Sequence, residues 1–216
     1  MPNTSLLFLL IFAACIVGSF VNPLWGLAGY LLEYYQRPSL HWWGSYLPDL
    51  RWNFTIALVF ALSFFLRRHT LPPVRDVRNA AGLMLVLLGV NMLLVQTWAV
   101  SAEMSWHWTE RYWKTIAVYF LIVGVVRTRW AFDLFLVLNM AGAAWWGYDA
   151  LGQRRVSARM EGVGSSDTLN SNLLAAHLLT ILPAIVLFIL AERDKRLRLA
   201  ALACLTATAA SGALAQ

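Results

Sequence analysis

The feature that most constrains this chain is its first uncharged stretch, because residues 1–32 contain no Asp, Glu, Lys or Arg. About 20 apolar residues are enough to cross the hydrocarbon core of a bilayer. Of the 216 residues, 60% are hydrophobic and 13% are charged, whereas soluble globular proteins have about 45–50% and about 25%. We therefore predict an all-α fold: a polytopic transmembrane helical bundle that forms a single domain over residues 1–216, with no sizeable soluble domain.

Later apolar blocks predict the remaining spans. They are Trp52 to Leu66, Asn79 to Ala102, Thr115 to Val126, Trp130 to Tyr148, Thr168 to Ala191 and Leu199 to Gln216. The first stretch is interrupted at Asn22-Pro23, and proline disrupts the interior of a helix. If residues 22–35 form a separate short span, the chain has eight spans and starts outside. If residues 5–35 form one kinked helix, it has seven spans and starts inside.

The net charge of +6 predicts membrane topology rather than a nucleic-acid partner, because Lys and Arg collect in loops that stay in the cytoplasm. Residues 67–78, 127–129 and 193–198 hold ten of the 17 Lys and Arg. We therefore predict that these segments lie inside. The alternating segments 36–51, 103–114 and 149–167 then face outward, with the bilayer as the surrounding partner.

Nine of the eleven tryptophans lie in or beside the segments predicted to face outward. Tryptophan anchors helices at the headgroup level of a membrane, and its flat ring also packs against sugars and lipids. The sequence leaves both interpretations open.

Inside the predicted spans, Asn91 and Asn139 are expected to bridge helices. Asp133 is expected to pair with Arg129, and Glu33 with Arg37.

Motifs for nucleotide binding, zinc proteolysis and serine hydrolysis are absent from the sequence. The two cysteines, Cys15 and Cys204, lie far apart in apolar runs and suggest neither a disulfide nor a metal site. We expect no cofactor, no metal and no nucleic-acid partner.

One outer segment is suited to an anion. Arg154, Arg155 and Arg159 precede Gly162, and Asp167 and Asn172 follow at the mouth of the next span. Guanidinium groups bind phosphate bidentately, and glycine lets backbone N–H groups approach an anion closely. The segment could grip a diphosphate at the headgroup level, or its arginines could simply be solvated.

The same residues resemble a known family. Arg159-Met-Glu-Gly162, Asp167 and Asn172-Leu-Leu-Ala175 running into Pro183 are similar to the R-x-x-G, D, N-x-x-A and L-P stretch of the O-antigen ligase and polymerase superfamily. The closest resemblance is to the N-terminal half of the O-glycosylation ligases associated with exosortase systems. Further similarity lies in three short motifs: Asn22-Pro23, His41-Trp-Trp-Gly44 and Tyr112-Trp-Lys114.

The resemblance implies an integral protein of the bacterial inner membrane. Such proteins transfer a glycan from undecaprenyl diphosphate to an acceptor on the periplasmic face, without nucleotide or metal. Arg159 would neutralise the diphosphate with Arg155, and Lys114 would assist from a neighbouring span. Gly162, Asp167 and Asn172 would support the loop.

The base that activates the acceptor is not identified. In the family it is a histidine on a large periplasmic loop beyond the region of resemblance, so the chain is expected to be truncated or to need a partner. His41, His107 and His177 are the candidates within this sequence.

The alternative is a non-enzymatic polytopic membrane protein. It would be a transporter half or an assembly subunit of a polysaccharide export system, and its arginines would only set the topology. Transporters commonly have paired broken helices, and only Pro23 and Pro183 interrupt predicted spans here. This favours the ligase-like interpretation.

Overall fold

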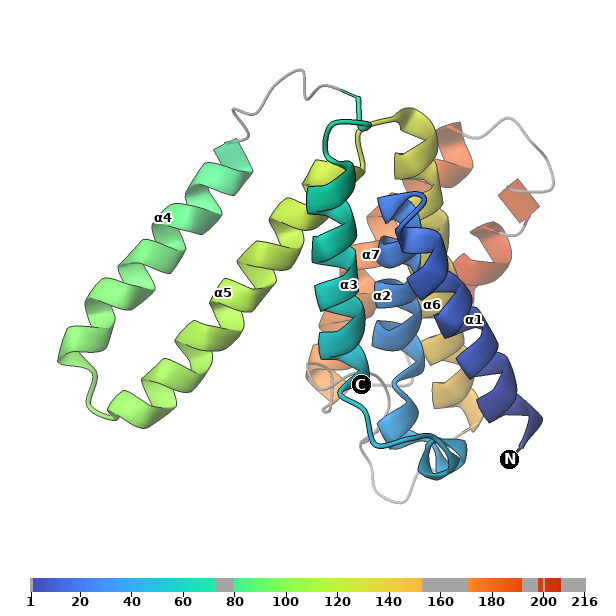
Figure 1. Cartoon of the computed structure of the whole chain (residues 1–216), viewed down its shortest axis with the longest axis horizontal. Helices are drawn as coiled ribbons and strands as arrows, with labels where there is room; N and C mark the ends of the chain where they lie inside the picture. The colour runs from blue at the N-terminus through green and yellow to red at the C-terminus, as the bar shows by residue number, and fades with distance from the viewer. Residues whose placement is uncertain (1, 73–79, 153–170, 192–197, 200, 207–216) are drawn as a thin grey trace.

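The computed structural model describes residues 2–72, 80–152, 171–191, 198–199 and 201–206, and all regular structure within them is helical (Figure 1). The helices are α1 (Asn3–Ser19), α2 (Pro23–Gln36), η1 (Pro38–Leu40), η2 (Trp42–Tyr46), α3 (Trp52–Arg67), α4 (Ala80–Val95), η3 (Gln96–Trp98), α5 (Ala102–Val125), α6 (Arg129–Gly152) and α7 (Ser171–Ala191). Residues 201–206 are also helical. The prediction of an all-α fold is confirmed.

The first apolar stretch forms two antiparallel helices rather than one kinked helix (Figure 1). Asn22 caps α2, because its Oδ1 accepts a hydrogen bond from the backbone N–H of Leu24 at 3.0 Å, and Pro23 occupies the first turn. A Cβ on Gly18 would lie 2.7 Å from the indole of Trp25, so the turn closes tightly only with glycine. Of the two alternatives, the structure has the separate helix at 23–36.

Helix α2 is the centre of the bundle and contacts α1, α3 and α6. Its glycines face its neighbours. A Cβ on Gly29 would lie 2.8 Å from both Cys15 and Ile56, and one on Gly26 would lie 3.0 Å from Phe60. Small residues at such positions let helices approach closely. Around them is a buried core that includes Leu27, Leu31, Tyr35, Phe60, Val125, Ala143, Trp146, Leu174 and Leu178.

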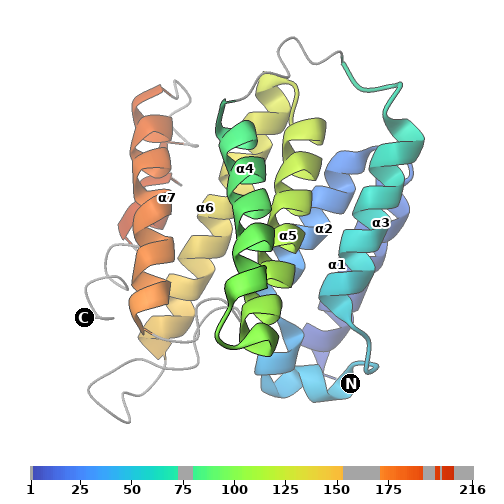
Figure 2. The ribbon, with the colours of Figure 1, turned by 90° about the vertical axis from the view of Figure 1, so that its left-hand side faces the viewer.

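Helices α4 and α5 form a hairpin that diverges from this bundle (Figures 1 and 2). The C-terminal part of α5 packs into the core through Val125 and Leu121. On α4, Gly82 and Gly89 face aromatic rings of α5, and most other side chains are exposed. Helix α4 is therefore covered on one side only.

One helical segment of the described residues, Ala80–Trp98, is long and apolar enough to cross a membrane by length and composition, with a mean hydropathy of 1.9 and 11% of its window buried. Three apolar helical segments are shorter: Asn3–Ser19, Trp52–Arg67 and Leu174–Leu190. At about 1.5 Å per residue, such helices fall short of a ~30 Å hydrocarbon core. The prediction of seven or eight spans is therefore not established by the fold.

The described parts of two segments predicted to lie inside, residues 67–72 and 127–129, meet at one end of the bundle. Arg67 Nε donates a hydrogen bond to the carbonyl of Phe20 at 2.8 Å, and Arg127 Nη1 donates one to the carbonyl of Pro72 at 2.7 Å. These bonds join the α1–α2, α3–α4 and α5–α6 connections. At the opposite end, Ser5 Oγ donates to the carbonyl of Trp43 at 2.8 Å and joins the start of α1 to η2.

Residues 103–114, predicted as an outer loop, are helical and belong to α5. Their charged residues interrupted the apolar pattern on which the prediction of a span rested. Because this half of α5 pairs with α4, it lies at the same depth as α4 along the bundle axis (Figures 1 and 2).

Candidate functional site

A polar and aromatic cluster, here called the α2–α6–α7 cluster, consists of Tyr34, Tyr35, Asn139, Trp146 and His177. Tyr35 Oη donates to Asn139 Oδ1 at 3.0 Å, which bridges α2 and α6 and confirms the bridging role predicted for Asn139. Trp146 is 2% exposed, and its Nε1 donates to the carbonyl of Tyr35 at 2.8 Å. The last turn of α2 is therefore fixed to the last third of α6.

His177 completes this cluster from the N-terminal part of α7. Its ring centroid lies 5.0 Å from that of Trp146, 5.8 Å from that of Tyr34 and 6.2 Å from that of Tyr35. The histidine thus packs among three aromatic rings. This environment accounts for His177 as a structural residue, and its role as a base stays a prediction.

The predicted diphosphate loop connects the two helices that supply Trp146 and His177. Arg155, Arg159, Gly162 and Asp167 lie outside the described residues. Asn172 belongs to the first turn of α7, and its side chain also lies outside the description. What the structure contributes is the position of the helix ends: α6 ends at 152 and α7 begins at 171, on either side of the cluster.

Lys114 is separated from this cluster. It lies within α5, and its Nζ is 2.5 Å from Glu110 Oε1 in an exposed i,i+4 pair. An exposed pair of this kind contributes little to stability, because water and salt screen it. The contacts of the described residues thus link Lys114 to its own helix, and they give no support to an assisting role beside Arg159.

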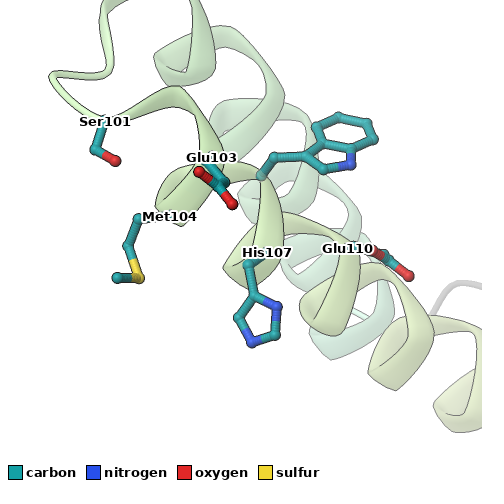
Figure 3. Close-up of a pocket in the computed structure, with 6 residues that line it drawn as sticks. Ser101, Glu103, Met104, His107 and Glu110 are labelled. Atoms are coloured by element: carbon teal, nitrogen blue, oxygen red, sulfur yellow. The ribbon is translucent and has the colours of Figure 1, made fainter.

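A groove on α5 was not anticipated as a site from the sequence. The cavity has a volume of about 640 Å³ and is lined by Ser101, Glu103, Met104, Trp106, His107 and Glu110 (Figure 3). Its carboxylates and imidazole could accept hydrogen bonds from hydroxyl groups. No set of His, Cys, Asp or Glu in the described part of the chain could hold a metal ion.

The spacing of its residues explains which way this groove faces. Glu103, His107, Glu110 and Lys114 lie at i, i+4, i+7 and i+11 and so share one face of α5. The same face reaches the core farther along, at Leu121. The polar stripe therefore lies on the bundle side of the hairpin. This spacing was the sequence signal that could have revealed the groove.

A second polar feature, here called the outer polar pair, consists of Glu33 and Arg37. Glu33 is 6% exposed, and the side chain of Asn53 lies near its carboxyl group. Its Oε2 and the Nη1 of Arg37 are buried, and neither has a hydrogen-bond partner among the described residues. An unsatisfied buried polar group costs about 1–3 kcal/mol, and more when charged. The predicted ion pair between the two residues is thus not closed.

The backbone at Arg37 explains why the pair stays open. Arg37 has φ 28° and ψ 81°, and its N–H still bonds to the carbonyl of Glu33 at 2.8 Å. Pro38 follows, and a residue before proline is disfavoured in the helical region. Arg37 therefore leaves the helix, and its guanidinium leaves the i,i+4 position in which it would face the carboxylate.

Residues 37–51 form a compact cap of two 3-10 helices. A Cβ on Gly44 would lie 1.8 Å from the carbonyl oxygen of Pro38, so only glycine fits. Trp43 is buried and stacks with His41 at 5.5 Å, whereas Trp42 is 71% exposed. Neighbouring tryptophans thus divide between packing and exposure, and both interpretations of the tryptophan distribution stay predictions.

No protein-family model, no curated protein and no solved structure matches this chain. The resemblance to the O-antigen ligase and polymerase superfamily therefore stays a prediction.

Proposed function

We propose that this chain is a bacterial inner-membrane protein of the O-antigen ligase and polymerase type, which handles a glycan carried on undecaprenyl diphosphate. The observation that carries the proposal is the arrangement of the two ends of the bundle. The connections rich in arginine meet at one end, joined by the bonds of Arg67 and Arg127. The compact cap formed by residues 37–51 and the α2–α6–α7 cluster lie at the other end (Figure 1).

The proposal includes seven or eight membrane spans. Its support is the sequence of apolar helices that alternate in direction between the two ends, together with the bare apolar surface of α4. Helix α5 has 24 residues and is long enough to cross at about 1.5 Å per residue. Its charged stripe lies on a different face of α5 from the one that packs against α4.

In the proposed reaction, an acceptor hydroxyl gives its proton to a base, its oxygen forms a bond to the anomeric carbon of the glycan, and the bond from that carbon to the diphosphate breaks. The negative charge that develops on the diphosphate would be neutralised by Arg155 and Arg159, which follow α6 in the chain. Fixed positive charge at a developing anion is usually a large part of such catalysis.

Binding of undecaprenyl diphosphate to the purified protein in detergent micelles tests the proposal. We expect saturable binding that Arg159→Ala weakens by roughly tenfold or more, because one charge-assisted contact is lost. Arg51→Ala is the matched control, since Arg51 is also predicted to face outward. Absence of binding by the parent protein would contradict the proposal and favour a transporter half or an assembly subunit.

A further inference from the structure

The outer polar pair has an unsatisfied acceptor and an unsatisfied donor on residues four positions apart in the chain. A carboxylate oxygen only accepts hydrogen bonds, and a guanidinium nitrogen only donates them. Glu33 Oε2 and Arg37 Nη1 are both buried without such a bond among the described residues. Native proteins rarely leave buried polar groups unsatisfied, so each instance calls for an explanation.

The charges of the pair restrict the ligand. Burying an anion beside the carboxylate of Glu33, or a cation beside the guanidinium of Arg37, would bring like charges together. A neutral ligand with both a donor and an acceptor avoids this cost. Neighbouring hydroxyl groups of a sugar meet the requirement, because one can donate to Oε2 while the next accepts from Nη1.

The surroundings of the pair are suited to a sugar as well. Asn53 lies near Glu33 and is itself exposed, and Arg37 is half-buried, so the pair lies close to the surface. Trp52, beside Asn53, is half-buried and packs in the cluster of Phe8 and Phe12. A carboxylate, a guanidinium, an amide and an indole are thus gathered at the α2–α3 end of the bundle.

We propose that Glu33 and Arg37 bind hydroxyl groups of a saccharide. The inference rests on the proposed function, in which the saccharide is the sugar next to the diphosphate. It goes further than that function by assigning the sugar to Glu33 and Arg37, at the C-terminal end of α2, rather than to the arginines after α6. The α5 groove is not needed for this contact.

Two lipid probes separate the sugar from the diphosphate. One is undecaprenyl diphosphate carrying N-acetylglucosamine, and the other is undecaprenyl diphosphate alone. For Glu33→Gln and Arg37→Gln we expect binding of the first probe to weaken by roughly tenfold to a hundredfold, because a hydrogen bond to a charged group is lost. Binding of the second probe stays as in the parent protein.

Asp49→Asn and Arg51→Gln are the matched controls, since both residues are exposed and lie in the segment between η2 and α3. They are expected to bind both probes as the parent does. The midpoint of thermal unfolding checks that each variant is folded. If Arg37→Gln does not fold, Arg37→Lys is used in its place.

Three outcomes are informative. Weaker binding of the sugar-bearing probe alone supports the inference. Equal binding of both probes by the parent and the variants overturns it and leaves the proposed function standing. If neither lipid binds but free N,N′-diacetylchitobiose does, and Glu33→Gln abolishes that binding, the proposed function fails and the saccharide site remains.

Discussion

Residues at the end of the bundle opposite the arginine-rich connections are joined by long-range hydrogen bonds. Trp146 and Tyr35 are 111 positions apart in the chain, and their bond caps a carbonyl in the last turn of α2. The ring of Tyr35 also lies against Gly142, where any Cβ would overlap it. These contacts fix the end of α2, and with it the position of Arg37.

Replacing Trp146 by Phe keeps an aromatic ring and removes the indole N–H. The carbonyl of Tyr35 then loses its buried donor, so we expect the free energy of unfolding to fall by about 1–3 kcal/mol. Trp145→Phe is the control, because Trp145 is exposed and the same substitution there should change stability by less than about 0.5 kcal/mol. Denaturant titration of both variants in one detergent measures the difference, and equal losses would contradict the assigned role.

Some residue contacts were predictable and others were not. Asp133 and Arg129 form the expected i,i+4 pair, with 3.9 Å between Oδ2 and Nε. Glu33 and Arg37 have the same spacing, but Arg37 has a positive φ, and its Nη1 has no hydrogen-bond partner among the described residues. Helical spacing predicts a contact only while both residues remain helical, and the proline after Arg37 ends the helix.

At the scale of elements, the hairpin of α4 and α5 depends on glycine. A Cβ on Gly89 would lie 3.0 Å from both Ile116 Cδ1 and Trp113 Cζ2. Tyr112 Oη also donates to the carbonyl of Leu85 at 3.4 Å. Because the two helices approach closely at these positions, the single surface that α4 shares with α5 is enough to hold α4 in place.

Gly89→Val should destabilise this hairpin by about 1–3 kcal/mol, because the added methyl groups overpack the interface with α5. Ala81→Val adds the same kind of side chain at an exposed position of α4 and is expected to have little effect. The unfolding midpoint of the two variants provides the measurement. Equal midpoints would show that α4 is not held through Gly89.

Helix positions followed from apolar runs wherever charges were absent. Asn22-Pro23 predicted a break, and the cap of Asn22 accounts for it physically. The N-terminal half of α5 was missed as a helix because hydropathy registers Glu103, Glu110 and Lys114 only as polar. The spacing of these residues in the sequence already indicated that they share one helical face. The separation of Lys114 from the α2–α6–α7 cluster could not be predicted in this way, because it depends on the divergence of the hairpin, a feature of tertiary structure.

At the scale of the whole molecule, charge counting grouped three described connections as the bundle does, but it predicted a loop at residues 103–114, which are helical. Residues 67–72 and 127–129 meet at one end, and residues 36–51 lie at the other. The number of Lys and Arg in a connection reflects the end of the bundle at which basic residues are tolerated, and connections at the same end share this property. Which end faces the cytoplasm stays a prediction.

Cysteine labelling of intact cells tests the predicted sidedness. In a variant with Cys15→Ala and Cys204→Ala, we expect a membrane-impermeant maleimide to modify Ser45→Cys and to leave Thr70→Cys unmodified. Both positions are exposed, and they lie at opposite ends of the bundle. Labelling after permeabilisation shows that Thr70→Cys is reactive. The reverse pattern would invert the topology.

The one-sided packing of α4 also governs how the isolated protein behaves. Its Leu83, Met84, Leu87 and Leu94 are each more than half exposed, and in water such a patch drives self-association. An amphiphile has to replace whatever covers this helix in the cell. The choice of detergent or nanodisc therefore determines whether a preparation contains dispersed particles or aggregates.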